Sequence, residues 1–452
     1  MNRLAYFAAV FSTVLLASPG FAKAPAAGAA AAAPADLTAT ATPEAVGFDA
    51  QRLKRLDAYM AKVVADGRVA GMTTLLARHG KVVEFNTYGK TSLATGQAMP
   101  KDEIFRIYSM SKPLTGVAMM ILFEQGKWRL DDPVTRYVPE FKNLKVMVSA
   151  DKDGNITGVE DMKRPPTMRE IMSHTAGFGY GLGDKHPVDK LYRKEEVLAS
   201  TGLHQMIERT AKIPLMYQPG SNWSYSSAVD IQGYIVEKLS GQTLGEFMQA
   251  NIFAPLKMKD TGFSTGPAKA NRLAAVYVGE RVNDKETGRI VEANDLFSNK
   301  MPDYSKPPAM ESGGGGLVST TMDYARFCQM MLNKGELDGV RILSPASVEL
   351  MDTNVIPRNV LVSNNGTGVA QFNDAVGFGL DFMVVNDAAR AGHMEGDKTM
   401  SWGGAAGTWF WIDPTNDVVF VGMIQRMGGS GGDDLGTMAR TLTYQALLHP
   451  EK

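Results

Sequence analysis

The spacing of apolar residues predicts strands near both ends of the chain and helices between them. Residues 49–64 repeat large apolar side chains at helical intervals, so an amphipathic helix is expected there. Two short strand-like runs, at 72–77 and 82–88, flank the turn His79-Gly80 and predict a β-hairpin. Further helices are expected at 112–125, 168–173, 226–239, 244–250, 322–333 and about 435–448, and further strands at 377–385, 408–413 and 418–424.

This order of elements predicts an α/β fold of the α+β type. Its simplest form is an antiparallel sheet assembled from the N- and C-terminal segments, flanked by the terminal helices, with a mostly helical domain inserted between them. We expect residues 44–108 and 306–450 to form the sheet domain and residues 109–305 the helical domain. A site is then expected where the two meet.

The first residues have the pattern of a secretory signal peptide. A positive residue near the start precedes an apolar run from 4 to 16 and then small residues, so we expect residues 1–24 to be removed on export. The run is shorter than the ~20 residues of a stable membrane helix. Residues 25–43, rich in Ala and Pro, are expected to be a linker. The mature protein is therefore expected in the periplasm or outside the cell, without a stable membrane span.

The amino-acid composition excludes several classes of protein and of functional site. The 452 residues are 44% hydrophobic and 21% charged, which is typical of a globular protein and excludes a collagen-like or disordered chain. With 47 Lys+Arg against 48 Asp+Glu, the net charge of -1 gives no reason to expect nucleic acid as a partner. The single cysteine, Cys328, cannot form an internal disulfide or a cysteine-rich metal site. We expect no metal and no cofactor.

Three serines compete for the role of nucleophile. The pattern Ser-x-x-Lys occurs at Ser109 and again at Ser149, where Lys152 lies in a run of turn formers and predicts an exposed hairpin tip. Ser430 lies in Gly-Gly-Ser-Gly-Gly, which matches a nucleophile elbow, but the acid and histidine that this motif needs further along the chain are missing. We expect the last two to be a hairpin and a glycine-rich loop.

Ser109 precedes a segment that is apolar nearly all round and predicts a buried helix. Pro113 is tolerated only in a first turn, so the helix is expected to begin at about Ser109. Positions i and i+3 share a face, which brings the amine of Lys112 to the Ser109 hydroxyl. Burial disfavours the ammonium, so Lys112 could act as a base. An N-capping serine followed by a lysine that reaches the surface is the alternative.

Three segments together carry a resemblance to a known family. They resemble the serine β-lactamase and penicillin-binding protein superfamily, in the branch of class C β-lactamases, DD-peptidases and family VIII carboxylesterases. Their order is the family's own, and with the framework runs between them they span most of residues 44–448. The segments are Ser109-x-x-Lys112, Tyr225-Ser226-Ser227 and the run Trp402-Gly403-Gly404-Ala405-Ala406-Gly407-Thr408.

The resemblance implies a mechanism. Ser109 would be the nucleophile that forms an acyl-enzyme, and Lys112 and Tyr225 would share the role of base. The sequence does not assign the proton to one of the two. The amides of Ser109 and Ala405 would form the oxyanion hole. Glycines beside the strand let a substrate approach its backbone. The expected substrate-binding residues are Trp402, Gly403, Gly404, Ser227, Phe178, Tyr180 and Trp223.

Two departures from the family pattern bear on the substrate. Trp402 stands where class C enzymes and peptidases place Lys or His, and Ser227 stands where Asn is usual. Both changes weaken recognition of a substrate with a free carboxylate, and they favour hydrolysis of carboxylic esters with small or medium acyl groups. A β-lactamase or DD-peptidase, an acyltransferase using the same acyl-enzyme, and a non-catalytic binding protein on this scaffold are the alternatives. His174 is expected to shape a loop.

Overall fold

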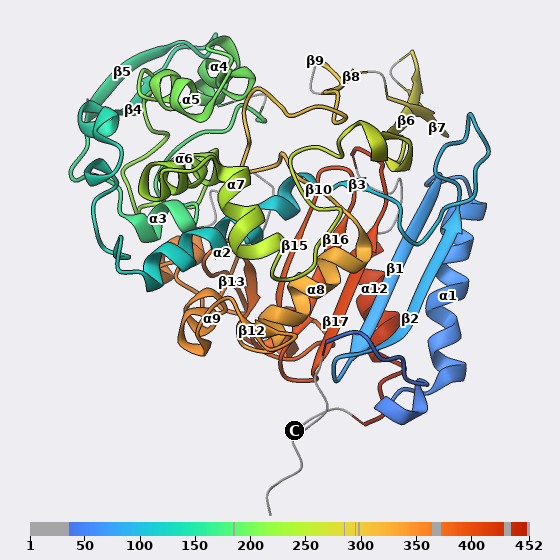
Figure 1. Ribbon diagram of the computed structural model, residues 1–452. Helices are drawn as coiled ribbons and strands as arrows, with labels where there is room; N and C mark the ends of the chain where they lie inside the picture. The colour runs from blue at the N-terminus through green and yellow to red at the C-terminus, as the bar shows by residue number, and fades with distance from the viewer. Residues whose placement is uncertain are drawn as a thin grey trace, which may run out of the picture. The chain divides into compact units, whose positions relative to one another are not determined.

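Strands from the two ends of the chain form one antiparallel sheet (Figure 1). The computed structural model describes residues 36–183, 186–283, 285–293, 295–296, 299–363, 372–428 and 435–449. The sheet has seven strands in the order β13-β14-β15-β16-β17-β1-β2, so the N-terminal strand β1 pairs with the last strand β17. Their bounds are β1 Gly71–Arg78, β2 Lys81–Gly89, β13 Val376–Phe378, β14 Met383–Val385, β15 Met400–Gly403, β16 Trp409–Asp413 and β17 Val418–Met423.

The central strands are buried on both faces, and their side chains alternate between two cores. On β16, Trp409 and Trp411 lie in one hydrophobic cluster, while Phe410 and Ile412 lie in the other. Successive side chains of a strand point to opposite faces, so a run of apolar residues without polar interruption is what a doubly covered strand requires. Burial on both faces explains why residues 408–413 and 418–424 are mostly apolar.

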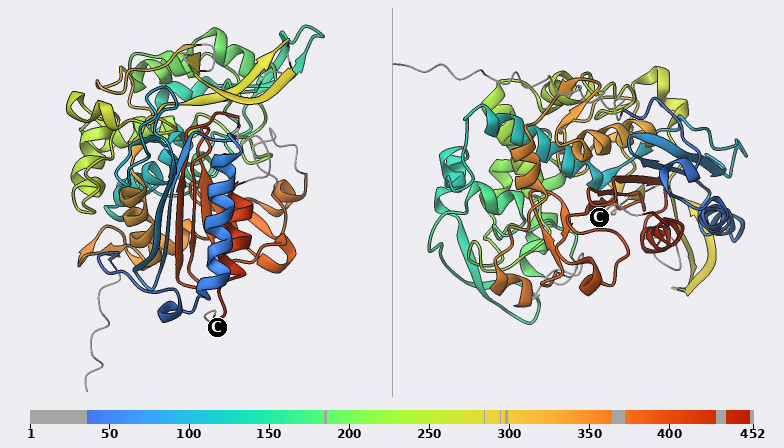
Figure 2. Two further views of the ribbon diagram at one scale, coloured as in Figure 1. Left: turned by 90° about the vertical axis from the view of Figure 1, so that its right-hand side faces the viewer. Right: turned by 90° about the horizontal axis from the view of Figure 1, so that it is seen from below.

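Terminal helices cover one face of the sheet. The helices α1 (Ala50–Ala65) and α12 (Leu435–Tyr444) lie side by side there (Figure 2), and α8 (Thr321–Leu332) packs against β1, β16 and β17 on the other face. The start of α1 is fixed by Asp49, whose side chain accepts a hydrogen bond from the Arg52 amide at 2.8 Å. This N-cap satisfies a backbone donor that the helix itself leaves open.

The middle of the chain is mostly helical. Buried helix α2 (Ser111–Glu124) packs against α6 (Ala228–Ser240) and α7 (Leu244–Met248) (Figure 1). The other helices are α3 Met168–Met172, α4 Pro187–Lys194, α5 Leu203–Thr210, α9 Pro345–Met351, α10 Arg358–Ser363 and α11 Ala388–Ala391. Short two-stranded pairs are β3 Phe105–Arg106 with β10 Val318–Ser319, β4 Lys145–Ala150 with β5 Ile156–Asp161, β6 Tyr277–Val282 with β7 Lys285–Glu292, β8 Asp295–Leu296 with β9 Asn299–Lys300, and β11 Glu336–Leu337 with β12 Val340–Arg341.

The predicted fold class, an antiparallel sheet flanked by terminal helices with helices between its halves, is confirmed. One predicted strand is wrong: residues 377–385 form two strands, β13 and β14, joined by a turn at Asp381, whose φ is 63°. The part of the expected linker that is described pairs with the folded body, since Leu37 is buried and Val82 donates its amide to the Ala39 carbonyl at 2.9 Å. The predicted signal peptide lies outside the described residues, and the domain boundaries stay a prediction.

Within the described ranges, no helix is long and apolar enough to cross a bilayer.

Candidate active site

Ser109 lies on a short turn that leads into the buried helix α2. The turn is a 3-10 helix, Tyr108–Met110, and α2 begins only at Ser111, two residues later than the sequence suggested. Tyr108 has a φ of 42°, in a region that residues other than glycine rarely adopt and that is often found at functional sites. Pro113 lies in the first turn of α2, as its missing amide requires.

Lys112 is fully buried and directs its amine at three oxygen atoms. Its Nζ donates to the Gly314 carbonyl at 2.7 Å, to the Tyr180 hydroxyl at 3.2 Å and to Ser109 Oγ at 3.4 Å. An ammonium has three protons to donate, so these partners match the charged form of the side chain. The predicted contact between Ser109 and Lys112 is present, although the bond is long.

The protonation of Lys112 differs from the expectation based on burial alone. Burial favours a lower pKa for the amine, but the neighbouring Tyr180 and Tyr225, with a smaller contribution from Asp230, outweigh it and raise the pKa above its ordinary value. The direction of this shift favours the ammonium form of Lys112. A charged lysine stabilises negative charge on an oxygen beside it.

Tyr225 and Trp402 meet next to Lys112, although they are far apart in the sequence. Lys112 Nζ lies 4.5 Å from the centre of the Tyr225 ring, and the Tyr225 ring lies 5.6 Å from that of Trp402. Trp223 stacks on Tyr225 at 6.3 Å, and Phe378 meets Trp402 edge to face at 5.4 Å. The indole nitrogens of Trp223 and Trp402 are buried and have no hydrogen-bond partner. These aromatic rings form a wall beside the proposed nucleophile.

His174 packs behind this wall. Its ring lies 5.0 Å from that of Tyr225, and its Nδ1 and the Ser226 hydroxyl are 2.9 Å apart. Burial, together with the positive charge of Lys112, lowers the pKa of His174 well below its ordinary value, so the ring is neutral. This placement agrees with a role in shaping the loop that carries Tyr225.

The end of β15 lies against the turn that carries Ser109. Gly404 donates its amide to the Thr408 carbonyl at 2.8 Å, and the Thr408 hydroxyl donates to the Ile107 carbonyl at 3.5 Å. Ala405 follows in the turn after β15 and is exposed to solvent. Ala405 and Ser109 therefore lie on neighbouring segments, which is the arrangement that two amides of an oxyanion hole need.

Two adjacent glycines at this position provide a matched test. A Cβ on Gly404 would collide with the Ile107 carbonyl oxygen and the Thr408 hydroxyl, whereas a Cβ on Gly403 would meet only the Thr408 carbonyl, at 3.3 Å. We expect Gly404→Ala to lower the free energy of unfolding by about 1–3 kcal/mol and to impair activity. Gly403→Ala should fold normally. Urea unfolding of both variants checks this, and equal stability would contradict it.

Other residues predicted to bind substrate are in contact with backbone and core groups of the protein. The Ser227 hydroxyl donates to the Gly179 carbonyl at 3.2 Å at the start of α6, and Phe178 packs against Phe141 in the core with ring centres 5.1 Å apart. Their roles in binding stay a prediction. Tyr180 was expected only as a pocket wall, yet its hydroxyl contacts Lys112.

The competing serines lie away from this cluster or outside the described residues. Ser149 lies on the exposed part of β4, where its hydroxyl is 3.0 Å from that of Thr157 on β5, and Lys152 is in the turn between these strands. The hairpin predicted there is confirmed. Ser430 lies outside the described residues.

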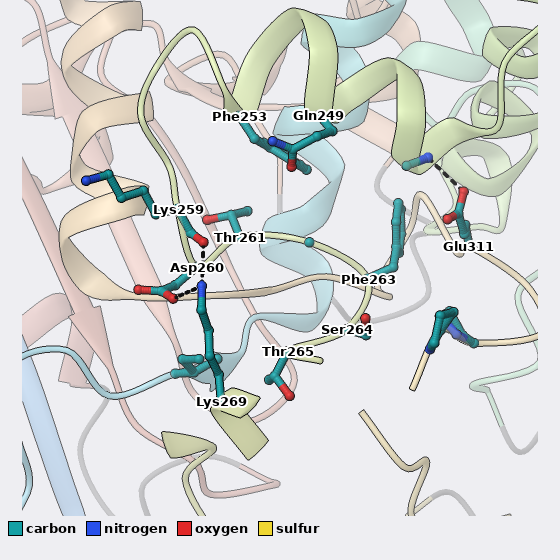
Figure 3. Close-up of a pocket in the computed structure, with 15 residues that line it drawn as sticks. Gln249, Phe253, Lys259, Asp260, Thr261, Phe263, Ser264, Thr265, Lys269 and Glu311 are labelled. Carbon is teal, nitrogen blue, oxygen red and sulfur yellow. Dashed lines mark hydrogen bonds and ion pairs between the residues drawn. The ribbon is translucent and has the colours of Figure 1, made fainter. Parts of the chain in front are cut away.

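A separate cavity of about 320 Å³ lies beside the turn after α7 (Figure 3). It is lined by residues 259–265 among others, and Ser109, Lys112 and Tyr225 are not among its lining residues. Asp260 and Lys269 face each other there at 2.7 Å (Figure 3), and Asp260 is also paired with Arg272. The Asp260 carboxylate is therefore paired with two cations, while Glu311, which also lines the cavity, accepts a hydrogen bond from the Gly245 amide at 2.7 Å. Across the described parts of the chain, no group of three His, Cys, Asp or Glu side chains could hold a metal ion.

Comparison with known proteins identifies the family. The family model described as Beta-lactamase matches residues 56–445. The chain belongs to the Beta-lactamase family. The predicted membership of the β-lactamase and penicillin-binding protein superfamily is thereby confirmed.

Relatives of the chain include esterases and hydrolases. Esterase EstB of Burkholderia gladioli is 30% identical over 383 residues, which cover 82% of this chain and 90% of EstB. Protein Rv1367c of Mycobacterium tuberculosis is 33% identical over 362 residues, 79% of this chain and 86% of that protein. The solved structure of EstCE1, described as a hydrolase with promiscuous acyltransferase activity, has a TM-score of 0.72 and 26% identity, and the match covers 87% of this chain and 99% of EstCE1. The chain is thus a β-lactamase-fold protein of the serine hydrolase type.

Proposed function

We propose that this protein is an exported serine esterase that cleaves carboxylic esters with small or medium acyl groups. Ser109 attacks the ester carbonyl, and the acyl group is transferred to its Oγ while the alcohol leaves. The observation that carries the proposal is the position of Lys112, whose ammonium is within hydrogen-bonding distance of Ser109 Oγ at 3.4 Å and 4.5 Å from the Tyr225 ring. The proposal of export rests on the signal-peptide pattern of residues 1–24. Identifying the N-terminal residue of the protein recovered from a periplasmic fraction tests it.

In this mechanism, Tyr225 accepts the proton of Ser109. The ammonium of Lys112, 4.5 Å from the Tyr225 ring, stabilises the phenolate that takes the proton. The amides of Ser109 and Ala405 stabilise the negative oxygen of the tetrahedral intermediate. The proton on Tyr225 then passes to the leaving alcohol, and a water molecule attacks the acyl-enzyme by the same route in reverse.

The preference for esters is supported by the groups around the site. The side chain of Trp402 is uncharged and buried, so it offers no cation to a substrate carboxylate. The Ser227 hydroxyl is bonded to the Gly179 carbonyl, which leaves it less free to meet a peptide amide. EstB, which is 30% identical in sequence, is described as an esterase, and EstCE1, which shares this fold, is described as a hydrolase.

A comparison of substrates tests this preference. We expect kcat/KM for p-nitrophenyl butyrate to exceed that for nitrocefin and for a D-Ala-D-Ala peptide by at least ~100-fold, since a missing charge partner for the substrate carboxylate costs about 2–3 kcal/mol or more. Similar values for the three substrates would favour a β-lactamase or DD-peptidase.

An acyltransferase is the second candidate, because EstCE1 is described as having promiscuous acyltransferase activity. The same ester assay with an added primary alcohol separates the two. Release of mainly the free acid supports the esterase, and release of mainly the new ester supports the acyltransferase.

A further inference from the structure

A buried carboxylate, Asp230, is connected to Lys112 through one backbone residue. Asp230 is in the first turn of α6 and is fully buried. Its Oδ1 accepts hydrogen bonds from the Ser312 hydroxyl at 2.5 Å and from the Gly314 amide at 3.1 Å. The carbonyl of the same Gly314 accepts the shortest hydrogen bond of Lys112, at 2.7 Å. Gly314 is therefore held by Asp230 on one side and by the ammonium on the other.

The second oxygen of Asp230 also faces this group. Asp230 Oδ2 is buried without a hydrogen-bond partner. A Cβ placed on Gly314 would lie 2.8 Å from Asp230 Oδ2 and 3.1 Å from the Tyr180 hydroxyl, so both atoms converge on the space that glycine leaves empty. The Tyr180 hydroxyl is another partner of Lys112. The carboxylate thus lies close to two of the groups that accept hydrogen bonds from the ammonium, the Gly314 backbone and the Tyr180 hydroxyl.

Among the described residues, five titratable side chains interact with Lys112. Burial raises the pKa of Tyr180 and that of Asp381, while it lowers the pKa of His174. The remaining two side chains that interact with Lys112 are Tyr225 and Asp230. Burial raises the pKa of Asp230 too, but the Ser312 hydroxyl, the charge of Lys112 and the Gly314 amide oppose that rise. Asp230 is therefore the carboxylate best placed to keep a negative charge near the ammonium.

We propose that Asp230 is a positioning residue for the Ser109 reaction, which orients Gly314 so that the ammonium of Lys112 is directed at Ser109 Oγ and Tyr225. This inference rests on the proposed function of Ser109. Asp230 does not contact the substrate in this arrangement. It acts through Gly314 and through its charge, which helps to hold the proton of Lys112 during the reaction.

The variant Asp230→Asn tests the proposal, because asparagine keeps the size and one oxygen acceptor but removes the charge. We expect kcat for ester hydrolysis to fall about 10- to 100-fold with little change in KM. Without the negative charge, Lys112 loses its proton more easily, so the loss of kcat/KM at high pH should begin at a lower pH than in the unaltered protein.

Asp323→Asn is the matched control. Asp323 is a buried carboxylate in the first turn of α8 that accepts hydrogen bonds from the Asp260 amide at 2.7 Å and the Thr261 hydroxyl at 3.0 Å. Lys112 is not among the charges that shift its pKa. We expect this variant to lose stability but to keep the pH profile of the unaltered protein.

Two results would overturn the proposal: an unchanged kcat in Asp230→Asn, or a lower kcat with an unshifted pH profile, which indicates a purely structural role.

If Asp230→Asn does not fold, the variant Gly314→Ala tests the proposal instead, because its methyl group would press between Asp230 and Tyr180. A kcat equal to that of the unaltered protein would then contradict the proposal, and a loss of ~10-fold or more at constant KM would support it. Ser109→Ala, measured in parallel, separates this failure from that of the proposed function, since activity in Ser109→Ala rejects the function itself.

Discussion

Ser109→Ala is expected to lower kcat for p-nitrophenyl butyrate by on the order of 10⁴-fold or more, because it removes the atom that forms the acyl-enzyme in the proposed mechanism. Binding of the ester should change little, since the aromatic wall around Tyr225 and Trp402 is left in place. The variant should fold normally, because Ser109 is half-buried and the hydrogen bond that its hydroxyl accepts from Lys112 is long. Steady-state kinetics with a thermal melt as the folding check provide the measurement.

Two other serines are the controls for this variant. Ser149→Ala alters an exposed strand residue, and Ser430→Ala alters the glycine-rich run of the sequence, so both should keep full activity. Activity in Ser109→Ala, or its loss in either control, would contradict the assignment of the nucleophile.

Tyr225→Phe is expected to have the second-largest effect, a loss of about 10³-fold in kcat. In the proposed mechanism this change removes the group that accepts the proton of Ser109, while the ring still packs against Trp402. The structure also offers a matched variant, because the ring of a second tyrosine, Tyr180, lies 5.0 Å from Lys112 Nζ.

Tyr180→Phe should cost about 10-fold or less, because burial raises the pKa of Tyr180 and keeps its hydroxyl protonated, which makes it a poor base. It removes one hydrogen-bond acceptor of Lys112 and leaves Ser109 Oγ and the Gly314 carbonyl in place. Kinetics of the two variants under identical conditions rank the tyrosines. A larger loss in Tyr180→Phe than in Tyr225→Phe would assign the base to Tyr180.

Local patterns were sufficient to predict much of the fold. The helix α1 and the β1–β2 hairpin were predictable because each depends on neighbours in the sequence: an aspartate cap before the helix, and the turn His79-Gly80 between two apolar runs. The split of residues 377–385 was missed because its turn uses Asp381 at a positive φ, where a glycine would have been the usual signal.

The proposed site was predictable only in part. Spacing alone brought Lys112 to Ser109, and the resemblance selected Tyr225 and Trp402. The hydrogen bond from Lys112 to the Gly314 carbonyl could not be predicted, since every residue carries a carbonyl and sequence does not show which one approaches. The sequence also does not show that Tyr180 and Tyr225 lie close enough to Lys112 to oppose the effect of burial on its pKa. Burial can be read from an apolar helix, whereas the tyrosines that outweigh it come from distant loops.

Trapping the acyl-enzyme tests the central claim, that Ser109 carries the acyl group, most directly. The protein is mixed with excess p-nitrophenyl butyrate, quenched in acid within the first turnovers, digested and analysed by mass spectrometry. The mechanism predicts a butyryl group on the peptide that contains Ser109, mapped to that side chain and absent from Ser109→Ala. A butyryl group on Ser149, Ser430 or another residue, with Ser109 unmodified during turnover, would contradict it.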